Sequence, residues 1–206
     1  MGYRNLLFDL GNVLLFFDPD KALKELATHL KPLTALLLWA KKDEFLKELR
    51  GEADLLETGR MTIEQFYSRL KGKIGLELEL DQFVRIWNDI FTANQAMLDL
   101  ATELSGRYAC YIASNTNEAH FRHVLAEFPA LGFAKRAALS YELGELKPSR
   151  EFFRKALAKF GIAADESVFV DDIELNVEGA RQAGIQAIRS VDAGQVRAAL
   201  EALGVK

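Results

Sequence analysis

The chain has 206 residues, a formal net charge of −4, and hydrophobic side chains at 50% of its positions. This suits one globular domain with room for an inserted second unit, and the mild acidity gives no indication of a nucleic-acid or membrane surface. The apolar run LTALLLWA is too short to span a bilayer. The single cysteine, Cys110, cannot form an internal disulfide, and no signal peptide is expected in MGYRNLLFDL, so we expect a cytoplasmic protein.

The first predicted elements are a short strand and a long helical block. Residues 5–9 (NLLFD) form an apolar run that leads through an acid to Gly11, which is typical of a buried strand and a turn. From Pro19 to about Leu104, apolar residues recur at three- and four-residue spacing. This pattern predicts amphipathic helices in DKALKELATHL, DEFLKELR, TIEQFYSRLKGKI and DQFVRIWNDIF, with a capping box from Thr62 to Gln65. No strand is expected inside the block. Its aromatic residues are expected mostly in the core of a helical bundle, with one or two facing the site: Trp39, Phe45, Phe66, Tyr67, Phe83, Trp87 and Phe91.

The second half of the chain alternates strands with helices. Strands are predicted in YACYIAS, RAALS, SVFVDD and IQAIRS, and helices in NEAHFRHVLAEF, SREFFRKALAKFG, ELNVEGARQAG and AGQVRAALEALG. His120, in the first of these helices, could approach the site, but we expect it on the surface. Alternation of this kind predicts a Rossmann-like parallel sheet with helices on both faces, an α/β fold. We expect residues 1–17 and 96–206 to form this core and residues 18–95 to form an inserted helical cap.

Polar side chains follow four predicted strands, where open parallel sheets bind ligands. Taken singly, each has an ordinary interpretation as a turn, cap or surface residue. Together they offer a carboxylate nucleophile, a hydroxyl, a lysine and a carboxylate pair, which suits a Mg²⁺-assisted attack on phosphate. The residues are Asp9, Gly11 and Asn12; Ser114 and Asn115; Lys147; and Asp171 and Asp172.

Four segments, FDLGNV, IASNTN, GELKPSREFF and VFVDDIELNVEGARQAG, resemble the ordered motifs of the haloacid dehalogenase (HAD) superfamily of hydrolases. The resemblance covers the whole chain, with residues 18–95 in the place of the family's helical cap. The subgroup with FDLGNV includes bacterial phosphatases that act on α-D-glucose 1-phosphate.

The resemblance implies a role for each matching residue. Asp9 would be the nucleophile that becomes an aspartyl-phosphate, and Ser114 and Lys147 would bind the phosphoryl oxygens. Lys147 would also hold Asp9 ionised. Asp172 would ligate Mg²⁺ directly. The metal site would also include Asp9, the carbonyl of Gly11, and Asp171, which would support the metal without direct contact or through a water molecule. The substrate site would also include Asn115, Asn12 and Asp18.

Gly11 departs from the family's pattern. Many phosphatases of the superfamily have an Asp two places after the nucleophile, and its side chain protonates the leaving group. Gly11 can supply the backbone carbonyl but no acid, which puts ordinary acid–base catalysis in doubt. Asp18 is the nearest replacement in sequence, although an N-cap just before Pro19 is the stronger interpretation of it.

Three functions remain open from the sequence. The first is a Mg²⁺-dependent phosphatase of a small phosphorylated metabolite such as a sugar phosphate. The second is a haloacid-type dehalogenase, against which the pair Asp171 and Asp172 argues, because two carboxylates beside a nucleophilic carboxylate need a cation. The third is a non-catalytic protein that binds a phosphorylated ligand. We expect a small phosphorylated substrate, no nucleic-acid or membrane partner, and a monomer or weak homodimer.

Overall fold

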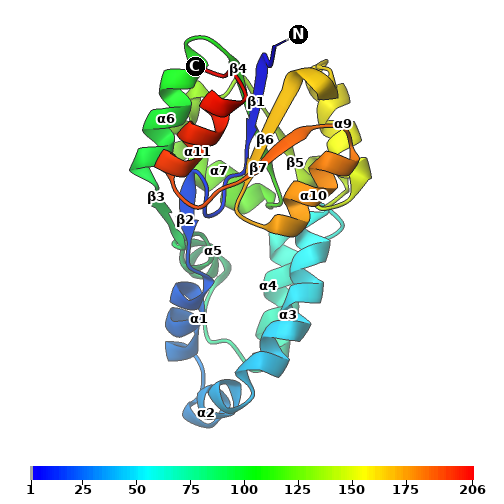
Figure 1. Cartoon of the computed structure of the whole chain (residues 1–206). Coiled ribbons are helices and arrows are strands. Elements are labelled where there is room, and N and C mark those ends of the chain that lie inside the picture. The colour runs from blue at the N-terminus through cyan, green and yellow to red at the C-terminus, as the bar shows by residue number, and fades with distance from the viewer. Residues whose placement is uncertain (1) are drawn as a thin grey trace.

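A parallel sheet of five strands forms the centre of the protein (Figure 1), in a computed structural model that describes residues 2–206. The strand order is β5-β4-β1-β6-β7 and every neighbouring pair is parallel, which confirms the predicted fold class. The strands are β1 (Asn5–Phe8), β4 (Ala109–Ser114), β5 (Arg136–Leu139), β6 (Ser167–Asp171) and β7 (Gln186–Arg189). Their carboxyl ends therefore meet at one edge of the sheet.

Helices cover both faces of this sheet, which explains why its central strands are continuous apolar runs. In β1, Leu6 and Phe8 pack into one buried cluster, and Leu7 packs into another on the opposite face. The first cluster is shared with α6 (Gln95–Ser105), α7 (Glu118–Glu127) and α11 (Ala193–Ala202), and the second with α9 (Arg150–Phe160) and α10 (Glu174–Gln182). Among residues 2–206, no helix has the length and apolar character needed to cross a bilayer.

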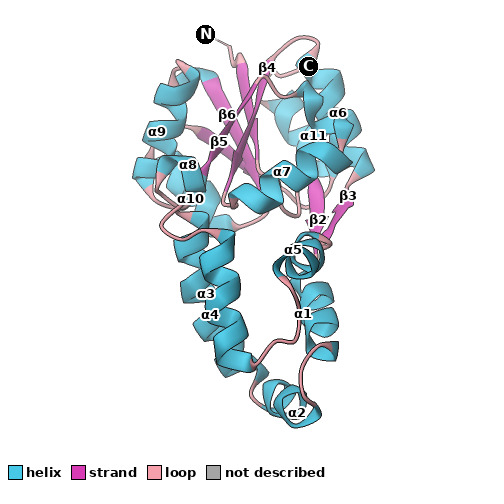
Figure 2. Ribbon diagram, turned by 180° about the vertical axis from the view of Figure 1, so that it is seen from behind, coloured by secondary structure: helices cyan, strands magenta, loops and turns pink. Residues whose placement is uncertain are grey.

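Five helices project from the carboxyl edge of the sheet (Figure 2) and form what we call the helical unit. They are α1 (Pro19–Thr28), α2 (Pro32–Ala40), α3 (Lys42–Glu57), α4 (Ile63–Ile74) and α5 (Leu80–Asn88). The unit has its own buried cluster, centred on Phe66 and Phe83, which is separate from the two clusters of the sheet. This separation supports the predicted cap at residues 18–95, whose boundaries stay a prediction.

The helical block contains a strand that the sequence did not indicate. The chain enters the unit through β2 (Leu15–Phe17) and leaves it through β3 (Phe91–Ala93), and these two strands pair antiparallel. The predicted helix DQFVRIWNDIF was wrong at its end, because Phe91 lies in β3. Strands of three residues are too short to show an alternating pattern.

Two further expectations for the unit need revision, the length of one helix and the burial of Trp39. The helix predicted in DEFLKELR continues as α3 to Glu57. The apolar run LTALLLWA, for which no element was predicted, lies within α2. Most of the unit's aromatic residues pack against its buried cluster, as predicted, but Trp39 is 41% exposed. Trp39 lies on α2 at the far end of the unit (Figure 2), where few neighbouring helices can cover it. The capping box of Thr62 and Gln65 at the start of α4 is confirmed.

Candidate active site

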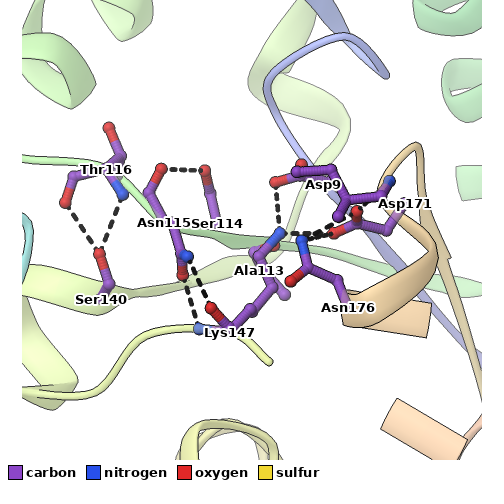
Figure 3. Close-up of polar contacts among 10 residues, drawn as sticks. Asp9, Ala113, Ser114, Asn115, Thr116, Ser140, Lys147, Asp171 and Asn176 are labelled. Carbon is purple, nitrogen blue, oxygen red and sulfur yellow. Dashed lines mark hydrogen bonds and ion pairs between the residues drawn. The ribbon is translucent and has the colours of Figure 1, made fainter. Parts of the chain in front are cut away.

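A buried lysine connects two acidic residues at the carboxyl edge of the sheet. The ammonium of Lys147 lies 2.6 Å from Oδ1 of Asp9, which follows β1, and 2.7 Å from Oδ2 of Asp171, at the end of β6. It also donates to the carbonyl oxygen of Ala113 in β4, at 3.1 Å. Figure 3 shows the ammonium between the two carboxylates. Lys147 therefore joins residues from three neighbouring strands.

The backbone around Lys147 is held in place by the loop that follows β4. The side chain of Asn115 donates to the carbonyl of Lys147 at 3.0 Å, and the amide of Lys147 donates to Oδ1 of Asn115 at 2.8 Å. The next residue, Thr116, donates its amide to Oγ of Ser140, which donates back to the carbonyl of Thr116. These bonds fix the loop of Ser114 and Asn115 and the loop of Lys147 relative to each other (Figure 3).

Asp171 is fully buried, and protein donors satisfy its carboxylate. Oδ1 accepts from the amide of Ile173 at 2.8 Å and from the side chain of Asn176 at 3.0 Å. Oδ2 accepts from Lys147 at 2.7 Å and from Asn176 at 3.1 Å. Three donor nitrogens therefore serve this carboxylate, and that of Asn176 is shared between both oxygens, which occupies most of its roughly four lone-pair positions. Asp171 is therefore fixed in position and has little capacity left for a further ligand.

Asp172 completes a group of three carboxylates. One oxygen each from Asp9, Asp171 and Asp172 lies within 4.8 Å of the others. Asp172 is half-buried. Burial and the charge of Asp171 raise its pKa, although a hydrogen bond from the side chain of Asn12 lowers it. Asn12 holds a left-handed backbone conformation with φ of 53°, and its Oδ1 accepts from the amide of Phe17.

The charges in this group do not balance. Burial raises the pKa of Asp9 to about 7, against the lowering effect of Lys147, and the charge of Asp171 adds to the rise. Burial alone would lower the pKa of Lys147, but the carboxylates of Asp9 and Asp171 outweigh it and raise that pKa. With all three acids ionised, one lysine leaves two negative charges in excess.

A divalent cation fits this donor set. It would neutralise the excess charge, and hard oxygen ligands from carboxylates are those that Mg²⁺ prefers. Because the carboxylate of Asp171 already accepts from three donor nitrogens, Asp172 and Asp9 are the better direct ligands, and Asp171 is the supporting one. Beside these residues lie the ammonium of Lys147, whose three N–H groups donate to Asp9, Asp171 and Ala113, and the hydroxyl of Ser114, which donates to the carbonyl of Asn115 at 3.2 Å. A phosphoryl group would accept from these two side chains in exchange for those partners. The arrangement can therefore bring a carboxylate nucleophile against a neutralised phosphate.

The structure brings most of the predicted site residues to this edge of the sheet. Gly11 lies in the tight turn after Asp9, where its backbone pairs with Leu15. Asp18 does not join the group. Its exposed side chain accepts from the amide of Asp20 at 3.1 Å and caps α1, as the N-cap interpretation expected.

The expectation that His120 lies on the surface was wrong, because α5 covers it. His120 is 6% exposed and stacks on the ring of Trp87. Its Nε2 lies 3.0 Å from the carbonyl oxygen of Trp87, and its Nδ1 lies 3.0 Å from the side-chain nitrogen of Asn117. These partners imply a neutral ring with the proton on Nε2. Burial lowers the pKa of His120 to about 4, which agrees with a neutral ring.

One acid near the site escaped the sequence analysis. Glu57 ends α3, and burial raises its pKa to about 7. The charges of Lys147 and Asp9 both act on its carboxyl. A signal existed in the sequence: an acid at the C-terminal end of a predicted helix sits where the helix dipole disfavours negative charge.

Comparison with known proteins agrees with this geometry. The D-ribitol-5-phosphate phosphatase of Bacteroides thetaiotaomicron is 27% identical over 89% of this chain and 89% of its own. A sesquiterpene phosphatase of Aspergillus oryzae is 26% identical over 92% of this chain and 91% of its own. A HAD family enzyme of B. thetaiotaomicron, solved with magnesium and inorganic phosphate, superposes with a TM-score of 0.79 at 27% identity and covers 93% of this chain and 96% of its own.

The family described as haloacid dehalogenase-like hydrolase matches residues 3–184, which include four of the five strands of the sheet, the helical unit and every residue of the candidate site. The chain therefore belongs to the haloacid dehalogenase-like hydrolases.

Proposed function

We propose that this hydrolase is a Mg²⁺-dependent phosphatase that acts on a small phosphorylated metabolite through an aspartyl-phosphate intermediate. The observation that carries the proposal is the grouping of Asp9, Asp171 and Asp172 around the ammonium of Lys147. A nucleophilic carboxylate, a cation site and a fixed ammonium are the groups that phosphoryl transfer from a dianion requires.

Each side chain then has a definite task. The free oxygen of Asp9 attacks phosphorus, while Lys147 and the hydroxyl of Ser114 donate to the phosphoryl oxygens. Asn115 holds the Lys147 loop, and Asn12 donates to Asp172. When bound by Asp9, Asp172 and the carbonyl of Gly11, with Asp171 in support, Mg²⁺ supplies charge neutralisation at the phosphate.

The substrate we favour is a monophosphate of a sugar or sugar alcohol. The similarity to a D-ribitol-5-phosphate phosphatase supports this class, and the FDLGNV motif extends it to glucose 1-phosphate. The net charge of −4 and the single cysteine support a cytoplasmic enzyme without nucleic-acid or membrane partners. We propose a monomer or weak homodimer.

Phosphate release from p-nitrophenyl phosphate, ribitol 5-phosphate and glucose 1-phosphate, with Mg²⁺ and then with EDTA, tests the function. We expect turnover that requires Mg²⁺ and is abolished by Asp9→Asn, because an amide keeps the shape of the carboxylate but is not a competent nucleophile. Halide release from a 2-haloacid in EDTA would instead establish a dehalogenase. Tight phosphate binding without any turnover would establish a non-catalytic binding protein.

A further inference from the structure

The site lacks a proton donor for the leaving group. Gly11 stands two residues after Asp9 and carries no side chain, and the side chain of Asp18 is engaged in capping α1. An alkoxide is a poor leaving group, so a substrate such as a sugar phosphate needs a positioned acid. Such an acid has to come from another part of the chain that reaches the site.

The end of α3 is pressed against the core next to the loop that follows β4. A Cβ atom built on Gly59 would lie 2.4 Å from the carbonyl oxygen of Tyr141, so only glycine allows this approach. Gly59 also has a φ of +69°, a conformation that other residues rarely adopt. Tyr141 follows Ser140, whose hydroxyl holds the amide of Thr116. Figure 2 shows that α3 and α4 reach the core.

Glu57 lies two residues before this contact and is only partly accessible to solvent. The described groups whose charges act on its carboxyl are Asp54 and Arg50 on α3, and Lys147 and Asp9 in the site. Two of these groups, Lys147 and Asp9, belong to the site, and the close approach of Gly59 to Tyr141 holds this segment against the core.

Ordinary stabilisation does not explain an acid at this position. Glu44, Glu48 and Glu52 of α3 all form ion pairs with neighbouring cations. Glu57 forms none with any described residue. A carboxylate at the last residue of a helix also opposes the helix dipole. Burial without a partner costs stability and is typical of a functional group.

We propose that Glu57 is the general acid and base of this phosphatase, supplied by the helical unit in place of the acid missing at Gly11. The inference rests on the proposed phosphatase function. In the first step, Asp9 forms a bond to phosphorus, and the bond from phosphorus to the leaving oxygen breaks with its electron pair on that oxygen. The carboxylic acid of Glu57 gives its proton to this oxygen, which yields a neutral alcohol.

In the second step the roles reverse. Water attacks phosphorus while the carboxylate of Glu57 takes one of its protons, and the bond between phosphorus and Asp9 breaks with its electrons returning to the Asp9 carboxylate. Phosphate leaves, and Glu57 is again protonated. The raised pKa of Glu57, about 7, suits both steps, since either protonation state is then accessible near neutral pH.

Replacing Glu57 with Gln tests the proposal through leaving-group dependence. We expect kcat/KM for ribitol 5-phosphate to fall by roughly 10²–10⁴-fold, the usual contribution of a general acid, and kcat/KM for p-nitrophenyl phosphate to change by less than about tenfold. The aryl substrate leaves readily without a proton, so its turnover also shows that the variant is folded. The matched control is Glu44→Gln, an exposed acid at the opposite end of α3, which should leave both values unchanged.

The second step gives an independent readout. Loss of the base slows hydrolysis of the aspartyl-phosphate, so Glu57→Gln should release a burst of p-nitrophenol close to one equivalent of enzyme. In the parent, kcat/KM for ribitol 5-phosphate should decline as the pH rises above about 7, because Glu57 loses its proton. Asp54→Asn removes a charge that raises this pKa, and should move the decline to lower pH.

A rescue variant completes the test. Gly11 has an ordinary backbone conformation, and a Cβ atom there would meet only Cβ of Phe17, at 4.0 Å. Gly11→Asp in the Glu57→Gln background should therefore restore a large part of the lost activity on the alkyl phosphate.

The outcomes separate the two proposals. Equal losses on aryl and alkyl substrates, or no loss on either, would overturn the role of Glu57 while the parent's Mg²⁺-dependent turnover stands. A parent that hydrolyses none of the phosphates would overturn the phosphatase function itself, and the role of Glu57 with it.

Discussion

Replacing Lys147 with Met removes the one ammonium that neutralises the buried acids of the site. The side chain of Lys147 is 1% exposed, and that of its partner Asp171 is fully buried. Methionine keeps most of the length of the lysine stem, so the change deletes the charge and its hydrogen bonds without opening a large cavity. Asp9 and Asp171 then face each other without a counter-charge.

Breaking a buried ion pair by removing one partner costs about 3–5 kcal/mol, because the remaining charge stays buried without compensation. Lys147 has two carboxylate partners and also donates to the Ala113 carbonyl, so we expect the upper part of this range. For a chain of this size, each kcal/mol lowers Tm by about 2–4 °C, which gives a decrease of about 8–20 °C.

Urea unfolding followed by circular dichroism, in EDTA so that no cation compensates, measures this loss. Lys155→Met is the matched control, because Lys155 and Glu145 lie 3.5 Å apart with one third of each side chain exposed. A pair that is partly open to solvent in this way is expected to be worth about 0–1 kcal/mol. A loss for Lys147→Met no larger than that of the control would show that the buried acids are not ionised around the lysine, and would refute the electrostatic account of the site.

Three further predictions follow from the cation site, His120 and the turn at Gly59. Mg²⁺ at about 100 times its Kd should stabilise the protein by about 2.7 kcal/mol in thermal unfolding, and Asp172→Asn should remove most of this gain; an undiminished gain would place the cation elsewhere. Burial lowers the pKa of His120 in the folded protein to about 4, below the unfolded value of about 6.5. The stabilisation from its neutral ring is therefore fully present above pH 6.5 and is lost as the pH falls toward 4, which lowers the free energy of unfolding by up to about 3 kcal/mol. His120→Gln should remove this acid sensitivity in urea unfolding at a series of pH values, and an unchanged profile would contradict a buried neutral ring. Gly59→Ala should separate the end of α3 from Tyr141 and lower kcat/KM for ribitol 5-phosphate more than for p-nitrophenyl phosphate, whereas equal effects would mean that this contact does not position Glu57.

The sheet and its polar edge were predictable because their signals are local. A parallel strand that is buried on both faces is a continuous apolar run, and the residue where it ends is visible in the sequence. Asp9, Ser114 and Asp171 could therefore be assigned to strand ends without knowing the strand order. Because all five strands are parallel, those ends necessarily meet at one edge.

The errors share a different cause, since they depend on how the helical unit meets the core. The pattern of NEAHFRHVLAEF does not show that α5 covers His120, because Trp87 comes from a segment far away in the sequence. Trp39 belongs to an apolar run that a helical bundle would bury. However, α2 lies at the end of the helical unit, and Trp39 stays exposed there. The importance of Glu57 likewise follows from a contact of the unit with the core.

The division of the reacting groups between two parts of the chain has a consequence for turnover. In the usual pattern of the superfamily, the acid lies two residues after the nucleophile, so both stay together whatever the cap does. Here Asp9 belongs to the core, whereas the proposed acid, Glu57, belongs to a unit joined to it by β2 and β3. Any movement of the unit away from Tyr141 would separate Glu57 from the phosphate. Protonation of the leaving group and activation of water would then occur only while the unit contacts the core, so its closure would control both chemical steps as well as access to the site.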